Sequence, residues 1–98
     1  MLQIWGGMFY KCKTFNCDLS GWDVSNVTNM GGMFNDCRNF NSDLSNWDVS
    51  NVKYMNYMFY YCENFNHDLS TWNVSNVKDM YNMFGGCTSL KNKPKWFK

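Results

Sequence analysis

The sequence predicts an α/β repeat fold: a solenoid in which each coil of 25 residues adds one strand to a parallel sheet and carries one short helix or 3-10 turn. Aromatic residues and cysteines recur at this spacing, and no insertion interrupts the period. The clearest columns are Trp22, Trp47 and Trp72; Phe9, Phe34, Phe59 and Phe84; and Cys12, Cys37, Cys62 and Cys87. A unit this short cannot bury its own apolar face, so the units must stack.

The strand of each coil is expected where apolar and polar residues alternate. In residues 40–47, FNSDLSNW, Phe40 and Leu44 are in phase and polar side chains stand between them. Trp47 breaks this phase, which predicts a bend near Asn46.

A turn and a short helix are expected in the second half of the coil. Ser50 and Asn51 predict the turn, because both side chains bond readily to nearby backbone. Apolar side chains then follow at the i, i+3, i+4 and i+7 spacing of a helical stripe. They are Met55, Met58, Phe59 and Cys62.

The chain divides into residues 1–90, a solenoid of nearly four repeats, and residues 91–98, a basic C-terminal cap. The opening residues already follow the repeat, since Trp5 and Met8 occupy the columns of Met30 and Met33. The first coil therefore begins in mid-coil and lacks a polar cap, whether the chain is a short protein or part of a longer solenoid. This predicts possible self-association through the N-terminal coil.

The C-terminal segment differs from the repeat in charge and in residue type. Five basic and eight acidic side chains give residues 1–90 a net charge of −3, whereas the last eight residues carry four lysines: Lys91, Lys93, Lys95 and Lys98. Pro94 stands in a leucine column and Phe97 in the tryptophan column. Lysine and proline at a sheet edge prevent strand addition, so we interpret the segment as a stop. Contact with an acidic partner or nucleic acid is the sharper alternative.

Composition excludes several classes of function. The 98 residues form one domain at most, and a net charge of +1 gives no field that would attract nucleic acid or an anionic membrane. No apolar run suits a membrane span or a secretory signal. The one histidine, His67, lies in a variable column without a paired acid or base, and no catalytic or phosphate-binding motif is present. We therefore expect no enzymatic activity and no cofactor.

The five cysteines favour buried thiols over a metal centre or disulfides. Four of them lie on the apolar stripe, where a free cysteine behaves as a small hydrophobe, and the fifth is Cys17. A linear column does not converge on a tetrahedral zinc ion. Disulfides between neighbouring coils remain the alternative.

An aspartate column allows two interpretations. Asp18, Asp43 and Asp68 would repel one another when stacked about 5 Å apart. Either each carboxylate accepts hydrogen bonds from nearby backbone or from the serine two residues later, or the column binds a divalent cation such as Ca²⁺. The glycine-rich turns that accompany aspartates in calcium-binding β-solenoids are missing, which favours the first interpretation.

Binding residues are expected in the columns that vary between coils. The third repeat and its neighbour place tyrosines where other repeats have Asn, Gly, Asp or Lys: Tyr54, Tyr57, Tyr60, Tyr61 and Tyr81. Tyrosine offers a large rigid surface with a polar tip and is favoured at interfaces. Ordinary packing between turns is the alternative.

The recurring string, as in residues 33–55, MFNDCRNFNSDLSNWDVSNVKYM, resembles the BspA-like leucine-rich-repeat surface proteins, in particular their mycoplasma-type lipoprotein branch. The similarity covers roughly Leu2 to Leu90. It implies a leucine-rich-repeat-like solenoid at a cell surface or virion, used for adhesion or protein binding without catalysis. The first hypothesis is thus a module for protein–protein interaction or surface adhesion. The second is a structural or assembly component that docks through its uncapped N-terminal coil, and a metal-binding solenoid is a distant third.

Overall fold

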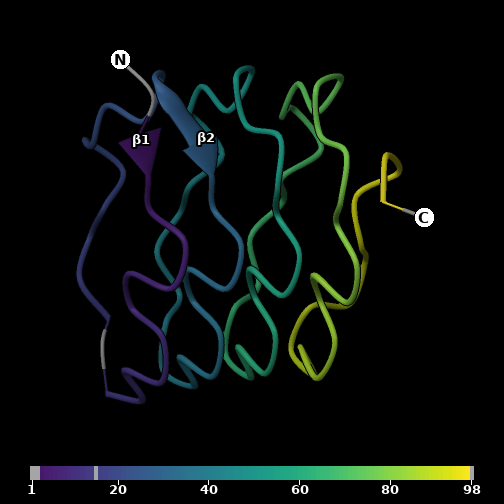
Figure 1. Cartoon of the computed structure of the whole chain (residues 1–98). Helices are drawn as coiled ribbons and strands as arrows, with labels where there is room; N and C mark the ends of the chain where they lie inside the picture. The colour runs from purple at the N-terminus through teal and green to yellow at the C-terminus, as the bar shows by residue number, and fades with distance from the viewer. Residues whose placement is uncertain (1–2, 15, 98) are drawn as a thin grey trace.

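The structure, a computed structural model, describes residues 3–14 and 16–97 and contains very little regular secondary structure. Strand β1 (Gln3–Ile4) pairs in parallel with strand β2 (Val27–Asn29), as Figure 1 shows. Isolated bridges continue this pairing from Asn29 to Tyr54 and from Tyr54 to Asp79. Leu2, Phe15 and Lys98, which the sequence assigns to the repeat or the tail, lie outside the described residues.

The predicted fold class is wrong. Over the described ranges the chain forms no helix, and its only strands are β1 and β2, so there is neither an extended parallel sheet nor a helix in each repeat. The molecule is a compact globule built from turns, with a radius of gyration of 12.0 Å and extents of 32 × 25 × 22 Å. No helix in the described part of the chain is long and apolar enough to cross a membrane.

Successive 25-residue stretches lie side by side from the purple N-terminal end to the yellow C-terminal end of Figure 1. Backbone N–H groups of one stretch donate to carbonyl oxygens of the next, over distances of 2.6 to 3.0 Å. Between the first two stretches the bonds run from Trp5 to Asn29, Gly7 to Gly31, Phe9 to Met33 and Lys11 to Asn35. The same four bonds recur at the two later junctions, so every second N–H in this region points to the neighbouring stretch.

This alternation explains why the helical stripe is not a helix. The N–H of Met58 donates to the carbonyl of Met55, a turn-type bond, but the N–H groups of Tyr57 and Phe59 donate to the next stretch instead. Tyr57 and Tyr61 also have positive φ values of 59° and 58°, which a right-handed helix does not allow. The i, i+3, i+4 spacing therefore describes a chain of turns with one buried side.

The expected strand over residues 40–47 is absent because side chains bind its backbone. The N–H of Asn41 donates to the Asn16 side chain at 3.0 Å, and that of Ser45 donates to the Asp43 carboxylate at 3.0 Å. The predicted bend near Asn46 is confirmed by a turn in which Trp47 N–H donates to the Leu44 carbonyl. The predicted turn at residues 50 and 51 is confirmed as well, by a hydrogen bond from residue 52 to residue 49.

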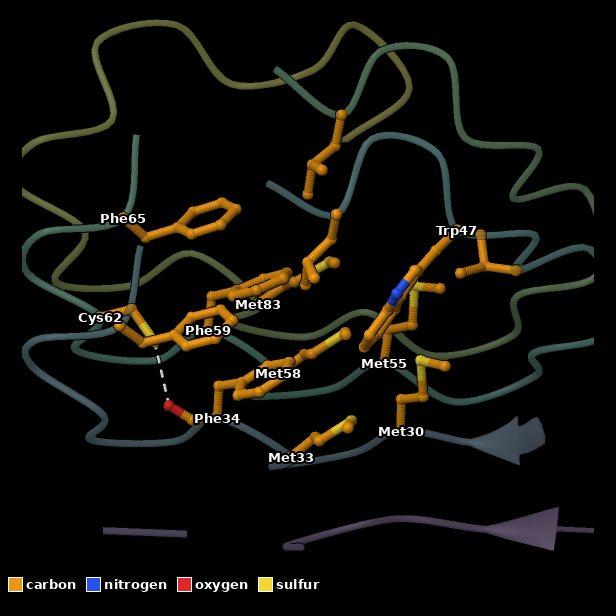
Figure 2. Close-up of a cluster of buried hydrophobic side chains, with 14 of the residues drawn as sticks. Met30, Met33, Phe34, Trp47, Met55, Met58, Phe59, Cys62, Phe65 and Met83 are labelled. Atoms are coloured by element: carbon orange, nitrogen blue, oxygen red, sulfur yellow. Dashed lines mark hydrogen bonds between the residues drawn. The ribbon is translucent and has the colours of Figure 1, made fainter. Parts of the chain in front are cut away.

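A stack of phenylalanine rings forms the centre of the core (Figure 2). Phe34, Phe59 and Phe84 follow one another with ring centroids 5.6 Å apart and nearly parallel planes. Phe40 and Phe65 stack beside them, at 4.1 and 4.5 Å from Phe34 and Phe59 respectively. Methionines fill the space toward the tryptophans; the fully buried ones are Met30, Met33, Met55, Met58 and Met83.

The tryptophans form a second column beside the phenylalanines, and its last member is Trp96. The indole N–H of Trp47, Trp72 and Trp96 donates to the carbonyl of Leu19, Leu44 and Leu69 respectively, at 2.9 to 3.0 Å. The assignment of Phe97 to the tryptophan column holds for its backbone only. Trp96 stacks on Trp72 at 6.3 Å, and Phe97 turns its ring against Phe84 at 5.1 Å.

Candidate functional site

Four tyrosines from the third and fourth repeats form one surface cluster, the tyrosine cluster: Tyr57, Tyr60, Tyr61 and Tyr81. Their rings meet edge to face, with Tyr57 5.2 Å from Tyr60 and 5.7 Å from Tyr81, and Tyr60 4.5 Å from Tyr61. Tyr61 and Tyr81 are 43% and 68% exposed, whereas the other two are half-buried. The structure thus brings together four of the five predicted residues.

Tyr54 stands apart from the tyrosine cluster. It lies in the backbone bridge between Asn29 and Asp79 and is exposed, but within the described ranges no ring contact joins it to the other four. Its grouping with them in the sequence reflects only the high tyrosine content of the third repeat.

Two cluster tyrosines occupy left-handed backbone positions. Tyr57 stands where the first two repeats have Gly7 and Gly32, and both glycines also have positive φ. Tyr61 stands where the fourth repeat has Gly86 and the first two have Lys11 and Asp36, all of them with positive φ. A large side chain with positive φ costs roughly 1 to 2 kcal/mol relative to ordinary backbone. Since neither ring is buried in the core, core packing does not offset this strain energy.

Glycines of the fourth repeat provide the surface on which the rings lie. A Cβ atom at Gly85 would come within 3.0 Å of the Tyr60 ring, and one at Gly86 would collide with the Tyr61 ring. Burial is the main cause that raises the pKa of the Tyr60 hydroxyl, followed by the neighbouring Tyr61. Repeats three and four are therefore complementary here, with tyrosines in one and glycines in the other.

The role of these glycines is the feature that the sequence prediction missed. A side chain at Gly85 or Gly86 would meet ring atoms of Tyr60 or Tyr61, so these glycines leave room for the tyrosine rings. The signal is present in the sequence, because Tyr60 and Tyr61 precede this glycine pair by one period. Comparing neighbouring members of a column would have found it.

The aspartate column forms local hydrogen bonds, as predicted. Asp18, Asp43 and Asp68 each accept a bond from the backbone N–H two residues later, at 2.9 to 3.0 Å. This bond is the main cause that lowers the pKa of Asp18 and Asp43. Within the described ranges, no three His, Cys, Asp or Glu side chains are grouped so that they could hold a metal ion.

The cysteine column is buried in three of its four members, and all five thiols are free. The thiols of Cys37, Cys62 and Cys87 donate to carbonyl oxygens of the preceding repeat at 2.8 to 3.0 Å. Burial raises the pKa of Cys37 and Cys87 to about 11, so these thiols stay protonated and unreactive at neutral pH. The prediction of burial is wrong for Cys12, which is exposed because no described stretch covers the first repeat.

His67 and the basic tail border a hollow of about 560 Å³. The His67 Nε2 atom lies 2.9 Å from the Asn41 carbonyl oxygen, so the ring takes part in the bonding between repeats. Lys91, Lys93 and Lys95 line the other side of the hollow. No nucleophile with an adjacent base is formed there by the described residues, and the hollow is open and polar.

The observed arrangement is a compact globule with an aromatic core and an aromatic surface cluster. The chain belongs to a protein family described as "Mycoplasma protein of unknown function, DUF285", whose family model matches residues 3–97. This match supports the mycoplasma-type part of the predicted resemblance and shows no link to BspA-like or leucine-rich-repeat proteins. No curated protein and no solved structure matches the chain.

Proposed function

We propose that this protein is a non-catalytic module that binds a protein partner through the tyrosine cluster, in the setting of surface adhesion. One observation carries the proposal: Tyr57 and Tyr61 place large rings at left-handed positions that glycine holds in at least one other repeat, and these rings join Tyr60 and Tyr81 in one surface cluster. Backbone strain that core packing does not offset is typical of functional sites. Tyrosines also dominate the binding energy of many interfaces.

The geometry of the cluster suits recognition of another protein. The edge-to-face contacts hold the four rings against one another. Binding a partner therefore costs little additional side-chain conformational entropy. The exposed hydroxyls add polar contacts at the rim of an apolar surface. The resemblance of the repeat to BspA-like surface proteins supports adhesion as the context.

The test is selection of partners from a random peptide library displayed on phage, with the immobilised 98-residue chain as bait. Peptides selected on the wild type are then measured against the double variant Tyr57→Gly/Tyr61→Gly. We expect binding to weaken at least ~10-fold, because a hot-spot aromatic contributes more than ~1.4 kcal/mol. Equal binding to both proteins contradicts the proposal.

The double variant is suited to this test because its fold should be kept. Gly32 and Gly86 show that the backbone accepts glycine at the equivalent positions. Relief of backbone strain offsets the lost ring contacts, so the free energy of unfolding in urea should change by less than about 1 kcal/mol. Tyr10→Ser is the matched control, since Tyr10 is exposed but belongs to the first repeat and not to the cluster. It should leave peptide binding unchanged.

A further inference from the structure

Along the row of alternating backbone bonds, the two ends of the molecule expose opposite backbone groups. In the row of four alternating bonds at each internal junction, the earlier stretch supplies the N–H donors and the later one the carbonyl acceptors. Outside this row the direction reverses, as in the bonds from Asn39 N–H to the Lys13 carbonyl and from Asn64 N–H to the Arg38 carbonyl. At the N-terminal end, the carbonyl oxygens of Gly6, Met8 and Tyr10 accept no hydrogen bond from any described residue, although the equivalent oxygens of the second repeat each accept one. This end is therefore a row of unused acceptors.

The C-terminal end carries the matching row of donors. The N–H groups of Asn82, Phe84 and Gly86 find no acceptor within residues 3–14 and 16–97, whereas the equivalent donors of the third repeat all do. A hollow of about 290 Å³ lies beside these donors, between Phe84 and Phe97. Donors and acceptors at the two ends have the same spacing, because both belong to one repeat.

Side chains at the N-terminal end are exposed in columns that are otherwise core. Met8 is 50% exposed and Met33 is 0% exposed; Trp22 is 39% exposed and Trp47 only 4%. Trp22 also lacks the carbonyl acceptor that Trp47 finds in the preceding repeat, as far as the described chain shows. Apolar surface and unused polar groups thus coincide on one face.

We propose that the N-terminal end binds the C-terminal end of a second copy of this chain, head to tail. The second copy supplies the N–H row for the acceptors of Gly6, Met8 and Tyr10, and its Pro94 carbonyl takes the place that Leu19 has for Trp47. A symmetric contact between two N-terminal ends would place the carbonyl rows of Gly6, Met8 and Tyr10 against each other, which leaves these acceptors unsatisfied.

Phe97 limits the strength of this contact. In the copy that contributes its C-terminal end, the Phe97 ring covers Phe84 at 5.1 Å and occupies the space that Phe9 of the other copy would take. Phe97 must turn aside before the copies stack, so association is weak and depends on concentration. Because a head-to-tail contact does not close on itself, the assembly grows beyond a dimer as concentration rises.

The first test is light scattering of the 98-residue chain over a concentration series. We expect the average mass of the wild type to rise with concentration, and Met8→Asp to remain a monomer because it buries a charge at the contact. Tyr54→Asp is the control: Tyr54 is exposed but belongs to the third repeat, away from both ends, so this variant should associate like the wild type. A wild type that stays monomeric at every concentration overturns the proposal.

The second test fixes the orientation of the copies. Thr14, Asn39, Asn64 and Ser89 form one column in which the Asn39 and Asn64 side chains lie 3.4 Å apart, so head-to-tail stacking places Thr14 beside Ser89 of the second copy. Thr14→Cys and Ser89→Cys are made in separate chains that also carry Cys12→Ser/Cys17→Ser. A disulfide-linked dimer should form in the mixture and in neither protein alone. A dimer from one protein alone shows a symmetric contact and overturns the proposal, whatever the outcome of the peptide selection.

Discussion

Single positions of the repeat hold different residues at the same left-handed backbone geometry. Gly86 has a φ of 76° and lies under the Tyr61 ring, whereas Gly32 has a φ of 66° with nothing near its missing side chain. The two glycines share one conformational demand and differ in what a side chain would touch. Their comparison separates backbone strain from the contact with tyrosine.

We predict that Gly86→Ala destabilises the protein more than Gly32→Ala. Both changes should cost about 1 kcal/mol for a side chain at positive φ, and Gly86→Ala must in addition displace the Tyr61 ring. Urea unfolding measures the difference, and near-ultraviolet circular dichroism should show disturbed tyrosines only for Gly86→Ala. An equal decrease in the free energy of unfolding for both variants would contradict the prediction, because it would mean that the Tyr61 ring is displaced without an energetic cost.

The indole hydrogen bonds allow a second matched comparison of residues. Trp72→Phe removes the donor to the buried Leu44 carbonyl, whereas Trp22→Phe makes the same change where no described acceptor is present. We expect Trp72→Phe to lower the free energy of unfolding by roughly 1 to 3 kcal/mol and Trp22→Phe to lower it by clearly less. Urea denaturation followed by circular dichroism tests this, and a larger loss for Trp22→Phe would contradict it.

At the scale of elements, short polar turns replace the strands and helices that the periodicity predicts. Asp23 and Asp48 each accept bonds from the hydroxyl and the backbone N–H of the serine two residues later, and Asn73 does the same through its amide oxygen with the N–H of Ser75. These bonds satisfy the backbone locally, so no sheet ladder is needed. The alternation in the sequence indicates which side chains are buried, and it does not indicate where the N–H groups go.

The turn aspartates predict how stability depends on pH. Hydrogen bonds from Ser25 and Ser50, first from the hydroxyls, lower the pKa of Asp23 and Asp48. A depressed pKa gives stability that is complete above the unfolded value near 3.9 and is lost as the pH falls through the folded pKa. The melting temperature should therefore decrease below about pH 4. In Asp23→Asn/Asp48→Asn, which introduces the residue type of Asn73 at both turns, this decrease should be smaller; an unchanged acid profile would show that other carboxylates dominate.

At the scale of the whole molecule, the periodicity identifies the buried columns and the turns but not the fold class. Phe34, Phe59 and Trp47 are buried as their columns predict, because burial follows directly from the period. The backbone between them is predicted as strand and helix because apolar spacing at 2 and 3.6 residues is typical of these elements. Left-handed residues such as Tyr57 fit neither a strand nor a right-handed helix. A tyrosine in the sequence does not predict a positive φ. The tyrosine cluster can be found from the sequence because it departs from the period.

The direction of the hydrogen bonds predicts a gradient of local stability along the molecule. Phe9, Phe34 and Phe59 donate equivalent backbone bonds of 2.9 Å, but Phe34 and Phe59 lie between neighbours on both sides and Phe9 lies at the half-exposed N-terminal end. Opening at that end exposes little new apolar surface, so the Phe9 amide should exchange with solvent deuterium faster than the other two. Hydrogen exchange followed by NMR measures all three in one sample. Because a second copy would cover Phe9, its exchange should slow as protein concentration rises, whereas Phe34 and Phe59 should change little; a Phe9 amide as protected as Phe59 in the dilute monomer would contradict an open N-terminal end.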